Sequence, residues 1–203
     1  MKKFIELNKS KAIFMIKFCF IVFGTLFFGM TLILAYFNIE TLNYNNYLFG
    51  FIGTISLTFW VSILAFFSWS LRNRKRTKLL QKYPLNKLSE IGFQDYLKNE
   101  KTKWFFTETI KAGYISNYFI TVDLNEKSFK TISFKTFVDF QKFDSQKDER
   151  LKSKNITVNF LEASKDYNTK DIGELSFNQL KNDLKEFTRI LSYENLKPIN
   201  DSY

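Results

Sequence analysis

The sequence has 203 residues but no histidine, and it contains one cysteine, two prolines and seven glycines. The absence of histidine removes the commonest general base, the commonest zinc ligand and every histidine-based catalytic triad. Cys19 has no partner for an intramolecular disulfide, and its place in an apolar run removes it as a candidate nucleophile. We therefore expect no catalytic residue of these types, no metal and no cofactor.

Glycines and acidic residues also form no recognisable site. The three glycines beyond residue 72 lie far apart, so no glycine-rich phosphate loop is present. Paired carboxylates serve as metal ligands or in glycoside hydrolysis. Four acidic residues lie in the region where strands are expected, but they belong to no known motif. These are Glu108, Asp123, Glu126 and Asp139. We interpret them as surface charge and expect no enzyme; an enzyme with a carboxylate site stays an alternative.

Charge is missing from two long apolar runs, residues 18–37 and 47–71. About twenty helical residues cover roughly 30 Å, the thickness of the hydrocarbon core of a bilayer. The first run is too long for the apolar core of a cleavable signal peptide. We predict a membrane helical hairpin over 12–71, with two transmembrane helices at about 12–37 and 47–71, an outer loop at 38–46 and a basic tail at 1–11.

The formal net charge of +10 gathers beside the two apolar runs. Five lysines lie within residues 1–17 and six basic residues within 72–82, whereas the loop 38–46 has none. Basic flanking residues stay on the cytoplasmic side, so we predict a multi-pass protein of a bacterial inner membrane with both termini cytoplasmic. The rest of the chain is close to neutral, which argues against nucleic acid as a partner.

Small residues recur at every fourth position of the second apolar run: Gly50, Thr54, Thr58 and Ser62. They share one helix face and allow another helix to approach closely. We predict that this face packs the two spans together, and a face for a homo-oligomer or for another membrane protein is the alternative. Neither run has an ionisable residue at depth, which argues against a transporter or pump.

A basic neck at 72–84 follows the second apolar run. It ends at Tyr83-Pro84, because proline disfavours helix in the residue before it. We predict that the neck continues the second helix beyond the membrane and acts as a topology anchor. Basic clusters of this size beside a span are also typical of sites for anionic lipid headgroups. The basic residues are Arg72, Arg74, Lys75, Arg76, Lys78 and Lys82.

Residues 85–203 are predicted to form one soluble, cytoplasmic α+β domain. Residues 102–134 are predicted to form an antiparallel β meander, within which apolar residues alternate from Tyr118 to Leu124. A short helix is expected at 85–91, turns at 111–113 and 125–127, further strands at 136–143, 156–160 and 171–175, and a charged loop at 144–154.

The clearest element of this domain comes near the C-terminus. Ser176 and Gln179 form a capping-box pattern, which is typical of a helix start. The apolar residues that follow are spaced alternately by three and four, which predicts an amphipathic helix up to about Asn195, packed on the sheet. These residues are Phe177, Leu180, Leu184, Phe187 and Leu191.

This order of elements, a two-span hairpin followed by a meander and a closing amphipathic helix, resembles that of bacterial membrane proteins with a small pleckstrin-homology-like (PH-like) domain. The resemblance implies a PH-like fold and assigns no site residue. We predict a non-enzymatic bacterial inner-membrane protein whose cytoplasmic domain binds a partner protein or lipid headgroups at the membrane surface. The alternative is an immunity protein against a membrane-acting toxin, which a neighbouring toxin gene would indicate.

Overall fold

The computed structural model describes residues 2–37, 44–124, 130–139 and 145–199. The chain divides into two compact units. The helical unit comprises residues 1–74 and 99–108, and the sheet domain comprises residues 75–98 and 109–203.

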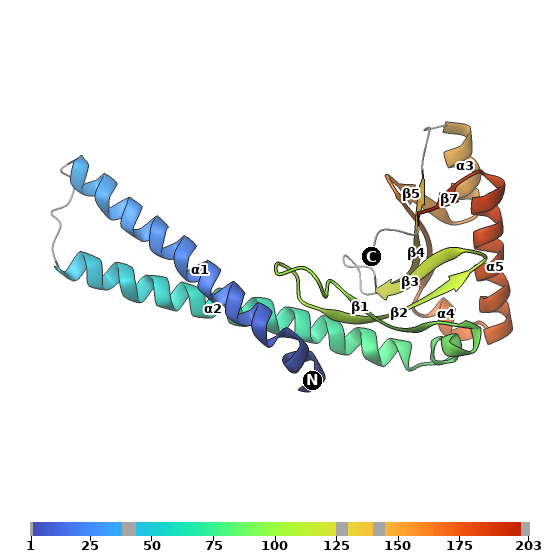
Figure 1. Ribbon diagram of the computed structural model, residues 1–203, viewed down its shortest axis with the longest axis horizontal. Helices are drawn as coiled ribbons and strands as arrows, with labels where there is room; N and C mark the ends of the chain where they lie inside the picture. Colours follow the sequence, from blue (N-terminus) through green and yellow to red (C-terminus); the bar gives the residue numbers. More distant parts are fainter. Residues whose placement is uncertain (1, 38–43, 125–129, 140–144, 200–203) are drawn as a thin grey trace. The chain divides into compact units, whose positions relative to one another are not determined.

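Two long helices, α1 (Lys2–Tyr36) and α2 (Tyr44–Leu80), dominate the helical unit, where they run antiparallel (Figure 1). Both are long and apolar enough to cross a membrane. Each extends beyond the apolar run that it contains, because the flanking residues are good helix formers and no proline interrupts them. The neck therefore continues α2 as far as Leu80, and a turn leads on to Pro84.

Most apolar side chains of α1 and α2 lie on the outside. None of the most apolar stretch of α1 is buried, and only 17% of that of α2 is. Large side chains such as Leu26, Trp60 and Leu64 are exposed over more than half of their surface. The hairpin thus presents a large apolar surface that the chain itself does not cover.

The sheet domain contains a seven-stranded sheet. Strand β4 pairs antiparallel with β3, β6 and β7, and the pairs β2–β3 and β5–β6 are antiparallel as well. The strand order is β1-β2-β3-β4-β6-β5, and β7 pairs with β4 beside this path. The strands are β1 (Gln94–Lys98), β2 (Glu108–Ile115), β3 (Tyr118–Leu124), β4 (Thr131–Asp139), β5 (Ile156–Asn159), β6 (Glu162–Asn168) and β7 (Lys197–Pro198). Consecutive β2, β3 and β4 form the expected meander.

Strand β4 is the centre of the sheet. Phe134 lies opposite Val122 of β3 on one side and Lys165 of β6 on the other. At its far end, Val138 lies opposite Pro198 of β7. The nine-residue strand therefore ties the meander, the β5–β6 hairpin and the C-terminal segment together.

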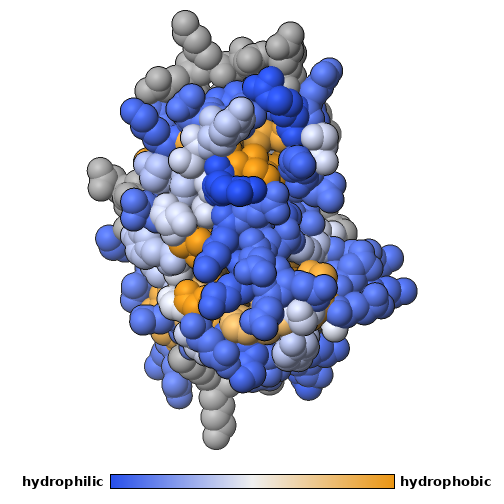
Figure 2. Space-filling model, turned by 90° about the vertical axis from the view of Figure 1, so that its right-hand side faces the viewer, coloured by the Kyte–Doolittle hydropathy of each residue, from blue (hydrophilic) through white to orange (hydrophobic). Residues whose placement is uncertain are grey.

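Helix α5 (Phe177–Tyr193) covers the core of the sheet domain. The predicted capping box is present, since the Ser176 hydroxyl accepts the Gln179 N–H and the Gln179 side chain accepts the Ser176 N–H. Leu180, Leu184, Phe187 and Leu191 are fully buried in the core cluster. The opposite face of α5 is polar, and the surface that Figure 2 shows is mostly hydrophilic.

The predicted turn at 111–113 is wrong, because these residues lie inside β2. The chain turns at Ser116-Asn117, where both residues have positive φ, the pattern of a tight two-residue hairpin. Gly113 is needed for a different reason. A Cβ there would lie 2.8 Å from the Gly92 carbonyl oxygen and 2.9 Å from the Phe93 Cα, so the neighbouring backbone leaves no room for a side chain.

Other local predictions also need correction. The segment expected to be a charged loop contains α3 (Ser145–Ser153), which buries Leu151 beneath an otherwise charged helix. The last expected strand is α4 (Asp171–Glu174), whereas the short helix at 85–91 is confirmed as the 3₁₀ helix η1 (Leu85–Ile91). The strand expected at 136–143 begins within β4, and its residues beyond 139, like the turn at 125–127, lie outside the described residues.

Candidate functional site

The ridge of small residues on α2 lies where α1 and α2 meet. Thr54, Thr58 and Ser62 are buried, and Gly50 is half-buried. The methyl group of Thr54 lies 3.8 Å from the position of a Cβ at Gly24. A Cβ at Gly53 would lie 2.9 Å from the ring of Phe27, so a side chain there would require this ring to shift. Sequence reading missed Gly53 because it stands outside the four-residue repeat.

The arginines of the neck do not all face the same surroundings. Arg72 is mostly buried in the helical unit, where its guanidinium lies 5.4 Å from the centre of the Trp69 ring. Its Nε atom lies 3.8 Å from Oε1 of the buried Glu108. The aromatic face and the opposite charge offset part of the cost of removing the guanidinium from water. Arg72 thus joins α2 to the start of β2.

Arg76 is completely buried in the sheet domain. Its Nε and Nη2 atoms lie 2.8 and 2.7 Å from Oδ1 of Asp123 in β3. The other carboxylate oxygen accepts a hydrogen bond of 2.9 Å from Nζ of Lys98 in β1. The Leu124 N–H also donates to Asp123. This network fixes the end of α2 to β1 and β3, so the side chain of Arg76 is enclosed in the sheet domain.

The remaining basic residues of the neck are exposed: Arg74, Lys75, Lys78 and Lys82. Lys75 and Lys78 are one helical turn apart, on the side of α2 away from Arg76. The neck is therefore divided by residue type as well as by face. Arginine occupies the two buried positions, where a planar guanidinium meets carboxylates, and lysine forms most of the exposed face, where an ammonium stays hydrated.

Two further polar clusters tie helices to the sheet. Asp183 of α5 accepts hydrogen bonds of 2.6 Å from Lys165 and 2.5 Å from the Tyr167 hydroxyl, both on β6. Burial, followed by this hydrogen bond, raises the pKa of Tyr167 far above its ordinary range. Arg150 of α3 forms a two-pronged pair with Glu194, and its hydrogen bonds lower the pKa of that carboxyl. Both clusters therefore have a structural role, because they join a helix to another element of the sheet domain.

In the part of the chain that the structure describes, we find no arrangement of side chains that is typical of a catalytic site. No group of three His, Cys, Asp or Glu residues there is placed to hold a metal ion. The interpretation as surface charge is wrong for Glu108 and Asp123, which are buried beside arginines. Asp139 lies in β4, and Glu126 is outside the described residues. Two open hollows of about 300 and 430 Å³ flank α5, and both include Ser116 of the β2–β3 turn.

The sequence prediction that the meander begins at residue 102 is wrong for residues 102–107. Only Glu108 belongs to a strand, and the segment before it packs on α1 and α2 within the helical unit. The signal was the run Trp104-Phe105-Phe106 beside two lysines, because three consecutive aromatic residues do not alternate as a half-buried strand does.

No protein-family model matches this sequence, and neither the curated proteins nor the solved structures compared with it give a match.

Proposed function

We propose that this chain is a multi-pass protein of a bacterial inner membrane, with both termini in the cytoplasm, that binds anionic lipid headgroups beside its second span. The observation that carries the proposal is the division of the neck. Arg72 is paired within the helical unit and Arg76 within the sheet domain, whereas Lys75, Lys78 and Lys82 remain exposed.

The apolar surface of α1 and α2 supports the membrane part of the proposal. Water around so many exposed Phe, Leu and Ile side chains is unfavourable by about 25 cal/mol for each Å² of apolar surface. A bilayer removes this cost. With the basic residues kept on the cytoplasmic side, the neck then stands in the layer of lipid headgroups, where each exposed lysine contributes roughly 1 kcal/mol of attraction to anionic lipid.

The proposed role is non-enzymatic, and the sheet domain is proposed to be PH-like. A seven-stranded antiparallel sheet with a C-terminal amphipathic helix supports the second point. Such a domain, in which Arg76 and Asp123 tie the last turns of α2 to β3, is proposed to present its outer surface to partners that reach the cytoplasmic face. We therefore propose that the lipid contact positions the domain and that a protein partner is a second, separate ligand.

The test uses the full chain reconstituted in bilayers that contain spin-labelled lipids. Electron paramagnetic resonance measures the share of each labelled lipid that the protein immobilises. We expect phosphatidylglycerol to be preferred over phosphatidylcholine, and the preference to fall with added salt because exposed charge is screened. The triple variant Lys75→Gln, Lys78→Gln, Lys82→Gln is expected to lose the preference several-fold.

The matched control removes three exposed lysines elsewhere in the sheet domain: Lys154→Gln, Lys170→Gln, Lys197→Gln. It makes the same change of net charge and is expected to keep the preference. Equal loss in both triple variants would show a general charge effect and contradict a site at the neck. An unchanged preference in the neck variant would also contradict it, and a protein partner would then be the better candidate.

A further inference from the structure

The segment between β1 and β2 carries two large apolar side chains that the protein does not cover. Trp104 is 63% exposed and Phe105 is 54% exposed. Lys101 and Lys103 beside them are exposed as well. Lysine next to exposed aromatic residues is the composition of a membrane interface, where the rings lie at headgroup level and the ammonium groups meet phosphates.

This segment is fastened firmly to α1. The Asn8 side chain pairs with the backbone of Thr107 in both directions, donating to its carbonyl oxygen at 2.9 Å and accepting its N–H at 2.6 Å. Lys11 donates to the carbonyl oxygens of Asn99 and Phe105. Because backbone groups and a buried amide make these bonds, the segment holds a defined position along the helix.

Phe106 differs from its two aromatic neighbours in the segment because it has a structural role. It is buried, with its ring centre 5.5 Å from that of Phe66, 5.8 Å from that of Trp69 and 6.1 Å from that of Phe4. These contacts already join the segment to both helices. The exposed Trp104 and Phe105 are additional to that packing, so holding the helices together does not explain them.

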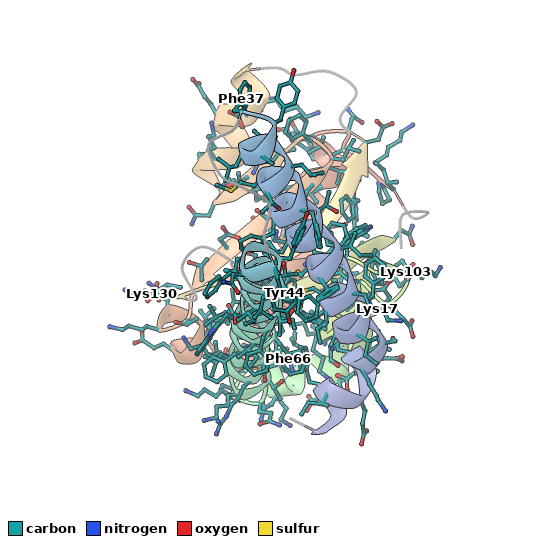
Figure 3. All side chains as sticks on the ribbon, turned by 90° about the vertical axis from the view of Figure 1, so that its left-hand side faces the viewer. Lys17, Phe37, Tyr44, Phe66, Lys103 and Lys130 are labelled. Atoms are coloured by element: carbon teal, nitrogen blue, oxygen red, sulfur yellow. The ribbon has the colours of Figure 1, made fainter. Side chains whose placement is uncertain are left out.

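The position of Trp104 along α1 is the decisive observation. Its ring lies edge-on to Phe14 and Phe18, with centroids 5.1 and 4.9 Å away. Lys17 lies between these two residues and is the last charged residue of α1. Figure 3 labels Lys17 of α1 and Lys103, the residue before Trp104 in the chain. Trp104 therefore lies within about one helical turn of the boundary between the charged and the uncharged part of α1.

We propose that residues 101–105 form an interfacial anchor, in which Trp104 and Phe105 enter the headgroup region of the bilayer and Lys101 and Lys103 bind lipid phosphates. This anchor rests on the proposed membrane insertion of α1 and α2. It attaches the helical unit to the cytoplasmic surface of the membrane, in addition to the two proposed spans. The anchor and the exposed lysines of the neck are separate lipid contacts.

The test is tryptophan quenching in reconstituted vesicles by lipids that carry bromine either near the headgroup or near the chain ends. The chain has three tryptophans. The variant Trp60→Phe, Trp69→Phe retains Trp104 alone, and the variant Trp69→Phe, Trp104→Phe retains Trp60, which lies in the middle of the second apolar run. We expect shallow bromine to quench Trp104 at least twofold more than deep bromine, and the order to be reversed for Trp60.

The two single-tryptophan proteins separate the two proposals. If Trp60 is quenched by lipid but Trp104 responds only to iodide in the water, the helices are inserted and the anchor is overturned. Stronger quenching of Trp104 by deep than by shallow bromine would also overturn it. If Trp60 is not quenched by any brominated lipid, the proposed membrane insertion fails and the anchor fails with it.

The lysines are tested in the protein that retains Trp104. At low salt, we expect brominated phosphatidylglycerol to quench Trp104 more than brominated phosphatidylcholine does, and Lys101→Gln with Lys103→Gln to remove this difference. The control variant Lys154→Gln, Lys170→Gln, which changes exposed lysines of the sheet domain by the same charge, is expected to keep it. A difference that persists without Lys101 and Lys103 would contradict their role as phosphate ligands.

Discussion

Helices α5 and α1 are both rich in leucine and phenylalanine, yet they bury these residues differently. In α5 the apolar residues follow one stripe, and Leu180, Leu184 and Phe187 are completely buried in the core of the sheet domain. In α1 they occur all round the helix, and residues such as Leu26 and Ile33 are about 60% exposed. A striped helix is covered by its own sheet, whereas a helix apolar on every side needs a surrounding apolar phase.

Helix α2 combines both kinds of surface along its length. Its apolar run resembles α1, with Leu64 61% exposed, but its last turns belong to the sheet domain. There Leu79 and Leu80 pack against the core cluster, and Arg76 is paired inside the domain. A single helix thus passes from an exposed apolar surface to a surface that packs in the sheet domain.

The largest expected effect concerns the point where α2 enters the sheet domain. Arg76→Met is expected to lower the free energy of unfolding of the sheet domain by about 3–5 kcal/mol, because it leaves the Asp123 carboxylate buried without its arginine. Hydrogen exchange of the β3 and β4 amides in detergent micelles measures it. Arg74→Met, at an exposed position of the same helix, is expected to change the value by less than about 0.5 kcal/mol. Similar losses in the two variants would contradict the importance of the pair.

The second prediction compares equal truncations in the two kinds of helix. Leu184→Ala in α5 is expected to cost about 2–5 kcal/mol in unfolding of the sheet domain, since it opens a cavity in the core. Leu64→Ala in α2 is expected to change this quantity by less than about 0.5 kcal/mol.

Leu64→Arg, in contrast, should reduce membrane integration, because arginine in mid-span costs roughly 2.5–3.5 kcal/mol. Carbonate extraction of membranes measures integration, and full retention of Leu64→Arg would contradict the assignment.

The smallest expected effect is a dependence of stability on pH at the end of α5. Because Arg150 holds the pKa of Glu194 below its ordinary value of 4.5, the folded state favours the charged carboxylate. The stabilisation is complete above about pH 4.5 and is lost as the pH falls through the lower pKa of the folded state.

Glu194→Gln removes this contribution. Its difference from the parent chain is expected to be about 0.2–1 kcal/mol at neutral pH, as for other pairs in contact with water, and to vanish in acid. Chemical denaturation at several pH values measures this difference. A difference that persists unchanged at low pH would contradict the electrostatic explanation.

Periodic patterns made part of this molecule predictable. The long apolar helices, the meander and the capped helix α5 each repeat one signal over many residues, and all three appear in the structure. The partners of the neck were not predictable, because Arg72 and Arg76 stand among other basic residues and meet carboxylates far along the chain. Local composition also hid α3, since one buried leucine in a charged stretch gives no periodicity.

Gly113 and residues 99–108 show a second limit of sequence reading. Gly113 indicated a turn, but tertiary contact with Gly92 and Phe93 is what requires glycine there. The aromatic run at 104–106 indicated a strand, but two hydrogen bonds between the Asn8 side chain and the Thr107 backbone fasten this segment to α1. In both cases long-range contacts overrode the local preference.

The most direct test of the account is the topology of the hairpin in intact cells. In a Cys19→Ser background, single cysteines are introduced by Thr41→Cys, in the loop between the apolar runs, and by Ser202→Cys, near the C-terminus. A maleimide that does not cross membranes is expected to label the first in intact cells and the second only after lysis. Labelling of position 202 but not of position 41 would reverse the orientation, and protection of both until lysis would contradict a membrane-spanning hairpin.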